Sequence, residues 1–287
     1  MPYQYSLAHL TALGCPPPEL AYVAARAGYD YISPRLIYMG LPGEPNYALA
    51  ENGEMLRLLP GDHQALVTTE GTGKLLRVDL QAGQVEKVMD VGGATGHMLA
   101  LSPDARYAYV TKIASGTLSR IDLATGRKTH ERPAGKGAEG VAVRPDGSEV
   151  WVTNRQDGTL TVHDPRTLAI RRRMSSKGFP IRVVFTPDGK HALVTNAAAA
   201  NLAVFDTRTK LPVATVDLAR QEADYQPTML GRGALPIGVA VDPRRPRAYA
   251  AISGSDRVAV IDTQSWKVID QWATGREPDA LGIVAGR

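Results

Sequence analysis

The sequence predicts a mainly β fold: a β-propeller of five complete four-stranded blades and a partial sixth, preceded by a short βαβ-like segment. Two markers that recur in step predict the ring. The first is a proline after a short apolar run, at Pro60, Pro103, Pro145, Pro187 and Pro243, which gives intervals of 43, 42, 42 and 56 residues. The second is an aspartate that keeps the same intervals, at Asp79, Asp122, Asp164, Asp206 and Asp262. Repeats of about 40 to 45 residues are typical of propeller blades.

One repeat, over residues 139–175, shows the strands of a blade. The runs "EGVAV", "SEVWVTN", "TLTVHD" and "AIRRRMSS" are separated by "PDG", "QDG" and "PRTL". Val150 and Val152 alternate with polar neighbours as a strand requires, and the glycines suit tight turns. The recurring aspartate is expected to cap a turn by accepting backbone N–H groups. The repeats run over about 55–94, 95–136, 137–178, 179–234 and 235–276, and the partial one over 277–287.

The segments "AYVTK", "WVTN" and "LVTN" resemble the YVTN family of propeller repeats, which is related in fold to lactonase-type propellers. The resemblance covers about residues 55–287. The "GH…WD" signature of WD repeats is absent from the sequence. The resemblance therefore implies a YVTN-type or lactonase-like propeller.

Residues 1–54 follow a different pattern. "YQYSLAHLTALG" and "YISPRLIYMG" are predicted strands, and "PPPELAYVAARAGYD" between them is a predicted helix. This βαβ order resembles the opening of a xylose-isomerase-type sugar-phosphate isomerase/epimerase barrel. The similarity spans two of eight barrel units, so isomerase activity is not expected, and His9 is expected to be a packed strand residue. Two unrelated pieces without a linker suggest a chimeric sequence.

The 56-residue interval holds an insertion over residues 217–234. An insertion in one blade maps to a loop on one face of the ring. Here it falls between two blades, on the face where the channel opens. A lid over a ligand and a plain surface excursion are equally supported. In the first case Tyr225 and Met229 are expected to cover an apolar part of the ligand.

The residues that begin the innermost strands are candidates for a site in the central channel. Alignment on the following proline places His97, Glu139, Ile181 and Ile237 there, and "REPDALGIV" adds Asp279 as the start of a sixth inner strand. One imidazole and two carboxylates suit a divalent metal ion. A hydrated channel mouth without a metal is the alternative.

Two functions follow from these positions. A metal held by His97, Glu139 and Asp279 would activate water for hydrolysis of lactones or phosphoesters, chemistry that the lactonase-like resemblance admits. Arg182 would then bind an anionic ligand. The alternative is a non-catalytic binding or scaffold propeller that presents this face to a small molecule or a protein. Whether the chain is an enzyme stays open at this stage.

The composition and the absence of certain motifs limit which cofactors and binding partners are expected. Cys15 is the single cysteine, so no internal disulfide forms. No haem-attachment sequence or nucleotide-binding glycine loop is present, and we therefore expect neither haem nor nucleotide. The net charge is +4, and "IRRRMSS" is the one basic cluster. It suits a solvated strand better than a nucleic-acid site.

No apolar run is long enough to span a bilayer, and the N-terminus does not read as a secretory signal. We therefore expect no membrane contact and a cytoplasmic location, although propellers of the resembled family are often exported. The incomplete sixth blade leaves a strand edge, which predicts a homodimer.

Overall fold

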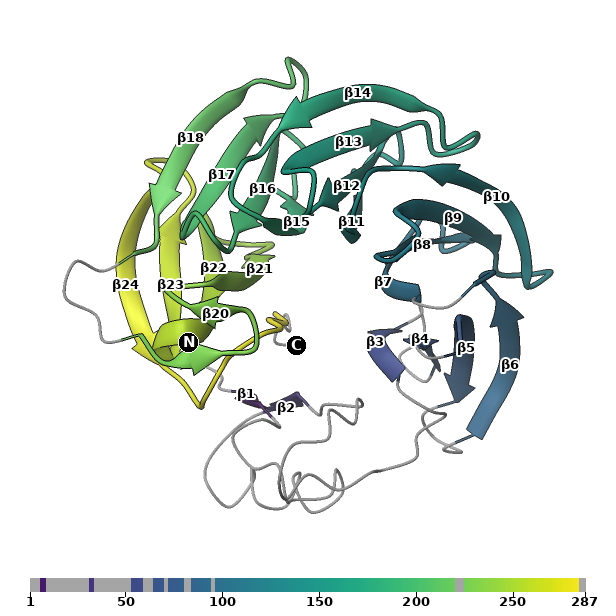
Figure 1. Cartoon of the computed structure of the whole chain (residues 1–287), viewed down its shortest axis with the longest axis horizontal. Helices are drawn as coiled ribbons and strands as arrows, with labels where there is room; N and C mark the ends of the chain where they lie inside the picture. The colour runs from purple at the N-terminus through teal and green to yellow at the C-terminus, as the bar shows by residue number, and fades with distance from the viewer. Residues whose placement is uncertain are drawn as a thin grey trace.

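The structure is a computed structural model that describes residues 6–8, 31–33, 53–58, 64–69, 72–79, 84–93, 96–219 and 225–283. Five four-stranded antiparallel sheets surround a common centre, with one strand of each sheet innermost (Figure 1). This arrangement confirms the predicted propeller. The expectations for His9 and Cys15 lie outside the described residues.

The chain builds the five blades in order, and each blade runs from its innermost to its outermost strand. Blade 1 comprises β3 (Gly53–Leu58), β4 (Gln64–Thr69), β5 (Lys74–Asp79) and β6 (Gln84–Asp90). Blade 2 comprises β7 (Gly96–Leu101), β8 (Tyr107–Lys112), β9 (Thr117–Asp122) and β10 (Arg127–Pro133). Blade 3 comprises β11 (Ala138–Val143), β12 (Val150–Asn154), β13 (Thr159–His163) and β14 (Ile170–Ser175).

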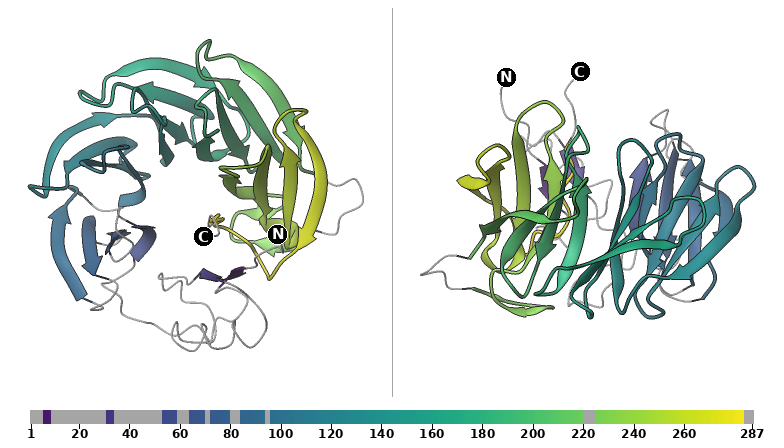
Figure 2. Two further views of the ribbon diagram at one scale, coloured as in Figure 1. Left: turned by 180° about the vertical axis from the view of Figure 1, so that it is seen from behind. Right: turned by 90° about the horizontal axis from the view of Figure 1, so that it is seen from above.

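The last two complete blades follow the same plan. Blade 4 comprises β15 (Pro180–Phe185), β16 (His191–Asn196), β17 (Asn201–Asp206) and β18 (Pro212–Asp217). Blade 5 comprises β21 (Pro236–Val241), β22 (Arg247–Ile252), the 3₁₀ turn η2 (Ser253–Ser255), β23 (Arg257–Asp262) and β24 (Lys267–Ala273). Because the strands alternate in direction, the turn after the second strand and the connection to the next blade lie on one face. We call this face the top (Figure 2).

Two short pairs lie outside the blades. β1 (Ser6–Ala8) pairs with β2 (Tyr31–Ser33) in parallel, as strands do on either side of a crossover connection. The division of the chain at residue 54 stays a prediction. In the inserted segment, β19 (Pro227–Thr228) and β20 (Gly231–Arg232) form a small hairpin. Within the part of the chain that the structure describes, no helix is long and apolar enough to cross a bilayer.

The hydrophobic cores lie between neighbouring blades. β12 is buried along its whole length, whereas β14 at the outer edge is mostly exposed. Trp151 on β12 is fully buried and meets Phe185 of blade 4 edge-to-face, with ring centroids 5.4 Å apart. The alternation in the sequence therefore serves two interfaces, one on each side of the sheets of blades 2, 3 and 4.

The recurring aspartates cap turns, as predicted. Oδ1 of Asp164 accepts the backbone N–H groups of Arg166 and Thr167, both at 2.8 Å. Asp206 and Asp262 hold the corresponding turns in blades 4 and 5 in the same way. These carboxylates therefore fix the turn between the third and fourth strands and are not available for chemistry.

A threonine near the end of the second strand joins each of the first four blades to the next one. Its hydroxyl donates to the backbone carbonyl of the residue at the channel position of that next blade. The pairs are Thr68 with His97 (2.7 Å), Thr111 with Glu139, Thr153 with Ile181 (2.8 Å) and Thr195 with Ile237 (2.7 Å). All four threonines are fully buried. The threonine of the recurring "VT" thus makes a hydrogen bond between neighbouring blades.

Glycine makes this approach possible. A Cβ on Gly140 would lie 2.3 Å from the carbonyl oxygen of Ile181, so only glycine allows the two inner strands to come this close. Gly238 on β21 has the same relation to Asp279, whose carbonyl oxygen would lie 2.0 Å from an added Cβ. The backbone of Asp279 therefore takes the place beside blade 5 that an inner strand takes elsewhere.

The seam after blade 5 differs from the other four. β22 carries Ala251 where the other second strands carry threonine, so the hydroxyl is missing. Residues 277–283 follow the inner side of blade 5 without forming a hydrogen-bonded strand. The partial sixth blade is therefore a backbone run held against Gly238.

Replacement of Thr153 by valine should destabilise the ring. Valine keeps the shape and removes the hydroxyl, which leaves the carbonyl of Ile181 and the N–H of Gly140 without this partner. We expect a loss of about 1 to 3 kcal/mol in the free energy of unfolding, measured with urea. Thr153→Ser keeps the hydroxyl and should retain most of the stability. Equal losses in both variants would contradict the role given to the hydroxyl.

The missing hydroxyl predicts the opposite result in blade 5. Ala251→Thr places a donor where Asp279 offers its carbonyl, and we expect a gain of about 0.5 to 1.5 kcal/mol in the free energy of unfolding. Ala251→Val adds the same bulk without the donor and serves as the matched control. A gain in the valine variant as large as in the threonine variant would show that filling space is responsible.

Candidate functional site

Four charged or polar side chains from three blades meet at the channel mouth on the top face. Glu139 begins β11 and stands at the centre. Its carboxylate accepts from Nη1 of Arg155 at 2.9 Å and from Nη1 of Arg182 at 3.0 Å. Nε2 of His97 lies 3.4 Å from its Oε1. We call Glu139, Arg155, Arg182 and His97 the mouth cluster.

Glu139 is buried and carries the negative charge of the mouth cluster. The residue is 4% exposed, and such burial by itself raises the pKa of a carboxyl group. The nearby imidazole of His97 and the charges of Arg182 and Arg155 outweigh this effect and hold the pKa of Glu139 below its ordinary value of 4.5. Its charge therefore serves to hold the two guanidinium groups in place.

The three predicted metal ligands differ in what they contact. Within the described ranges, no group of three His, Cys, Asp or Glu side chains is arranged to hold a metal ion. The reason is that the oxygens of Glu139 are taken by two arginines, whose positive charges oppose a cation. Asp279 lies against Arg182 at 3.7 Å, and its side chain is 49% exposed. These contacts do not favour a shared ion, and the expectation that His97, Glu139 and Asp279 ligate one ion stays a prediction.

Arg155 is the residue that sequence reasoning missed. It lies in the turn after β12, directly behind the "WVTN" run, and its guanidinium stands 5.3 Å from the ring centre of Phe179. Its Nε is buried and has no hydrogen-bond partner among the described residues. The sequence signal was an arginine that follows the threonine-asparagine pair, where the other described blades have other residues.

The inserted segment is anchored on blade 5. Tyr225 packs against the core between blades 4 and 5, and its carbonyl accepts from Nε of Arg232 at 2.8 Å. Met229 lies at the tip of the β19–β20 hairpin and is 72% exposed. Tyr225 therefore supports the hairpin, and Met229 is exposed on it. A role for either residue in covering a ligand stays a prediction.

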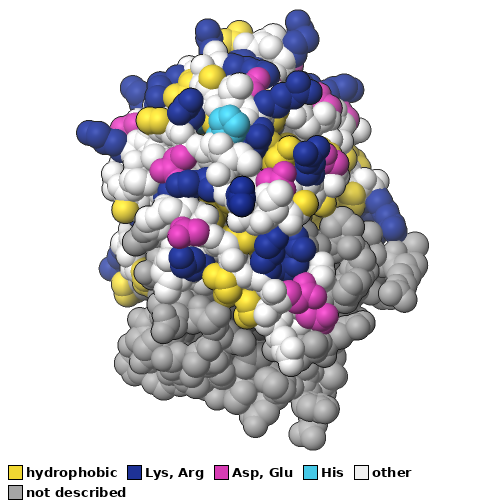
Figure 3. Space-filling model, turned by 90° about the vertical axis from the view of Figure 1, so that its right-hand side faces the viewer, with side chains coloured by type: hydrophobic (Ala, Val, Ile, Leu, Met, Phe, Trp, Pro, Cys, Tyr) yellow, Lys and Arg dark blue, Asp and Glu magenta, His cyan; other side chains and the backbone are white. Residues whose placement is uncertain are grey.

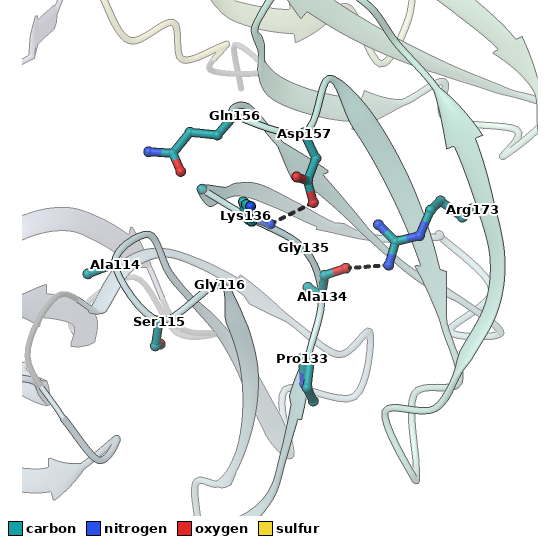
Figure 4. Close-up of a pocket in the computed structure, with 11 residues that line it drawn as sticks. Ala114, Ser115, Gly116, Pro133, Ala134, Gly135, Lys136, Gln156, Asp157 and Arg173 are labelled. Atoms are coloured by element: carbon teal, nitrogen blue, oxygen red, sulfur yellow. Dashed lines mark hydrogen bonds between the residues drawn. The ribbon is translucent and has the colours of Figure 1, made fainter.

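A second hollow lies on the top face, at the seam between blades 2 and 3 (Figure 4). The turn after β8, the connection before β11 and the turn after β12 line it. Asp157 accepts the N–H of Lys136 at 2.8 Å, and Nη2 of Arg173 donates to the carbonyl of Ala134 at 3.1 Å. Both hydrogen bonds connect the segment before β11 to other parts of blade 3. The hollow is therefore part of the packing between blades 2 and 3, beside the mouth cluster.

The basic run on β14 is partly engaged within the chain. Arg171 contacts Asp164 and donates to the carbonyl of Ser148. Lys and Arg side chains alternate with Asp and Glu over the side of the molecule drawn in Figure 3. The absence of nucleic-acid binding stays a prediction.

Comparisons with known proteins support the propeller. The family described as the Cytochrome D1 heme domain matches residues 62–184, which is less than half of the chain. No curated protein matches the sequence. The YVTN-type, lactonase-like and isomerase resemblances therefore stay predictions.

Two solved structures resemble the chain in fold. Hydrazine synthase of Kuenenia stuttgartiensis is similar with a TM-score of 0.57 and 16% identity, over 80% of this chain and 88% of that chain. A chain of a mitotic checkpoint complex is similar with a TM-score of 0.66 and 12% identity, over 78% of this chain and 68% of that chain. At these identities the likeness concerns the fold alone.

The family match corrects one expectation. The sequence predicted that haem plays no part, because no attachment motif is present, but the matched family is a haem domain. The reasoning failed because a haem can be held without covalent attachment, through side chains that a short motif does not reveal.

The mouth cluster fits the periphery of a haem better than its iron. Arg155 and Arg182 carry the planar donor groups that suit carboxylates. The imidazole of His97 has its Nε2 3.4 Å from the carboxylate of Glu139, within the cluster itself. Among the described residues, the other histidines lie away from the mouth, and His163 is fully buried with both ring nitrogens in hydrogen bonds.

Removal of the central charge should destabilise the ring. Glu139→Gln leaves two guanidinium groups facing a neutral amide, and we expect a loss of about 3 to 5 kcal/mol in the free energy of unfolding at pH 7. Because the pKa of Glu139 is lowered in the folded state, its contribution is present above pH 4.5 and is lost as the pH falls through the folded value. The variant should therefore lose less stability on acidification than the natural chain.

Urea unfolding at a series of pH values below neutrality measures both effects. Glu86→Gln, on the exposed face of β6, is the matched control and should change stability by less than about 0.5 kcal/mol. If Glu139→Gln behaves like this control, the mouth cluster does not hold the blades together.

Proposed function

We propose that the chain is a non-catalytic binding propeller that takes a small carboxylate-bearing ligand at the mouth cluster. The strongest support comes from Arg182, whose two terminal nitrogens have different partners. Nη1 of Arg182 donates to the buried Glu139 at 3.0 Å, whereas the acid that Nη2 faces among the described residues is the half-exposed Asp279, at 3.7 Å. A fixed guanidinium with one side turned to the channel is suited to bind a carboxylate.

Arg155 supports the same assignment. Its Nη1 is held by Glu139, and its plane lies near the ring of Phe179. Phe179 packs with Ile181 and Ile237 in an apolar cluster beside the mouth. The mouth therefore offers positive charge next to apolar surface, which suits an organic anion better than a bare inorganic one.

A metal-assisted hydrolase receives no such support. It required His97, Glu139 and Asp279 to share an ion, and the carboxylate of Glu139 is occupied by arginines. The family match places haem among the carboxylate-bearing ligands to be tested, and Arg155 and Arg182 are the residues that would hold its carboxylates.

Binding of two probes tests the proposal. Titration with haem, followed by absorbance, and with citrate, followed by calorimetry, should show binding of at least one of them. Arg182→Gln should weaken that binding by roughly 10- to 100-fold, because it removes a hydrogen bond to a charged group. Arg182→Lys keeps the positive charge and loses the planar guanidinium group. Its affinity should therefore lie between those of the natural chain and of Arg182→Gln.

Arg106→Gln is the control. Arg106 lies in the turn between the first and second strands of blade 2, on the face opposite the mouth, and its side chain is 63% exposed. This variant should bind like the natural chain. Failure of both probes to bind, or equal binding by the Arg182 and Arg106 variants, would overturn the proposal.

A further inference from the structure

We infer that Asp279 is an internal stand-in for the ligand's carboxylate at Arg182, and that the ligand and the segment around Asp279 compete for this arginine. The inference rests on the proposed function and adds to it a residue that sets affinity. Asp279 links the binding site to the last described residues of the chain through its contact with Arg182.

The two acids of the site differ in how firmly they are held. Glu139 is buried and accepts two guanidinium hydrogen bonds of ordinary length. The side chain of Asp279 is half exposed, and the 3.7 Å between its Oδ1 and Nη2 of Arg182 is longer than a hydrogen bond. Asp279 is therefore the acid that an incoming carboxylate can replace.

The backbone around Asp279 is attached at one end. Asp256 holds the preceding residues, because its carbonyl accepts from the N–H of Thr274 at 2.9 Å and its Oδ1 accepts from the N–H of Glu277 at 2.8 Å. Among the described residues, Pro278 is buried, and beyond it the segment makes the close approach to Gly238 and the ion pair with Arg182. Residues 279–283 are therefore held by fewer hydrogen bonds among the described residues than residues 274–277.

The seam itself favours such exchange. The four other seams carry a buried threonine hydroxyl on the carbonyl of the channel residue, and this one carries Ala251. The ion pair between Asp279 and Arg182 connects the segment directly to blade 4, across blade 5. A ligand that takes Arg182 removes this connection.

Asp279→Asn tests the competition in the full chain. The amide keeps the shape and removes the charge, so haem or citrate, whichever binds, should bind about two- to fivefold more tightly, the range expected for loss of a half-exposed ion pair. Asp270→Asn on the outer strand β24 is the matched control and should leave affinity unchanged.

The outcomes separate the two proposals. Binding that depends on Arg182, but is equal in the natural chain and in Asp279→Asn, would overturn the competition and leave the proposed function intact. Absence of binding in both proteins would overturn the proposed function itself.

Discussion

The hydrogen bond from a buried threonine to the next blade's channel carbonyl is the interaction on which the ring depends. Each blade is a small sheet that cannot bury both faces alone, so its neighbours must be placed at a fixed distance and register. A hydroxyl on the second strand and a glycine beside the channel residue fix both for Thr153, Gly140 and Ile181. Because the bond uses only the backbone of the channel residue, the side chain there is free to differ from blade to blade.

This separation explains why the channel positions could be found from the sequence and their chemistry could not. The spacing of prolines and aspartates placed His97, Glu139 and Asp279 at equivalent positions, and the bonds to His97 and Glu139 and the glycine contact at Asp279 agree with that alignment. Their interactions depend on Arg155 and Arg182, which lie in a turn and one position beyond the channel residue. A repeat pattern shows which positions are equivalent in the blades. It does not show which long side chains extend from one blade to another across the channel.

The expectation of a metal site shows the same limit. Counting potential ligands treats every carboxylate as available, but a buried carboxylate is taken by the nearest cations when the chain supplies them. At the mouth cluster the chain supplies two guanidinium groups within 3.0 Å of Glu139. The absence of a haem motif misled in a similar way, since such motifs describe attachment and not the charge and shape of a pocket.

The seam that lacks the threonine hydroxyl and the more exposed of the two acids beside Arg182 occur at the same place. Ala251 lacks the hydroxyl that fixes the other channel carbonyls, and Asp279, whose carbonyl would have received it, is also the half-exposed partner of Arg182. If the seam were as firm as the others, the carboxylate of Asp279 would be fixed in position and would block the arginine permanently. Loss of one hydroxyl makes the contact reversible. Ala251→Thr should then do more than stabilise the ring, because the same bond that fixes the backbone of Asp279 would strengthen its competition for Arg182.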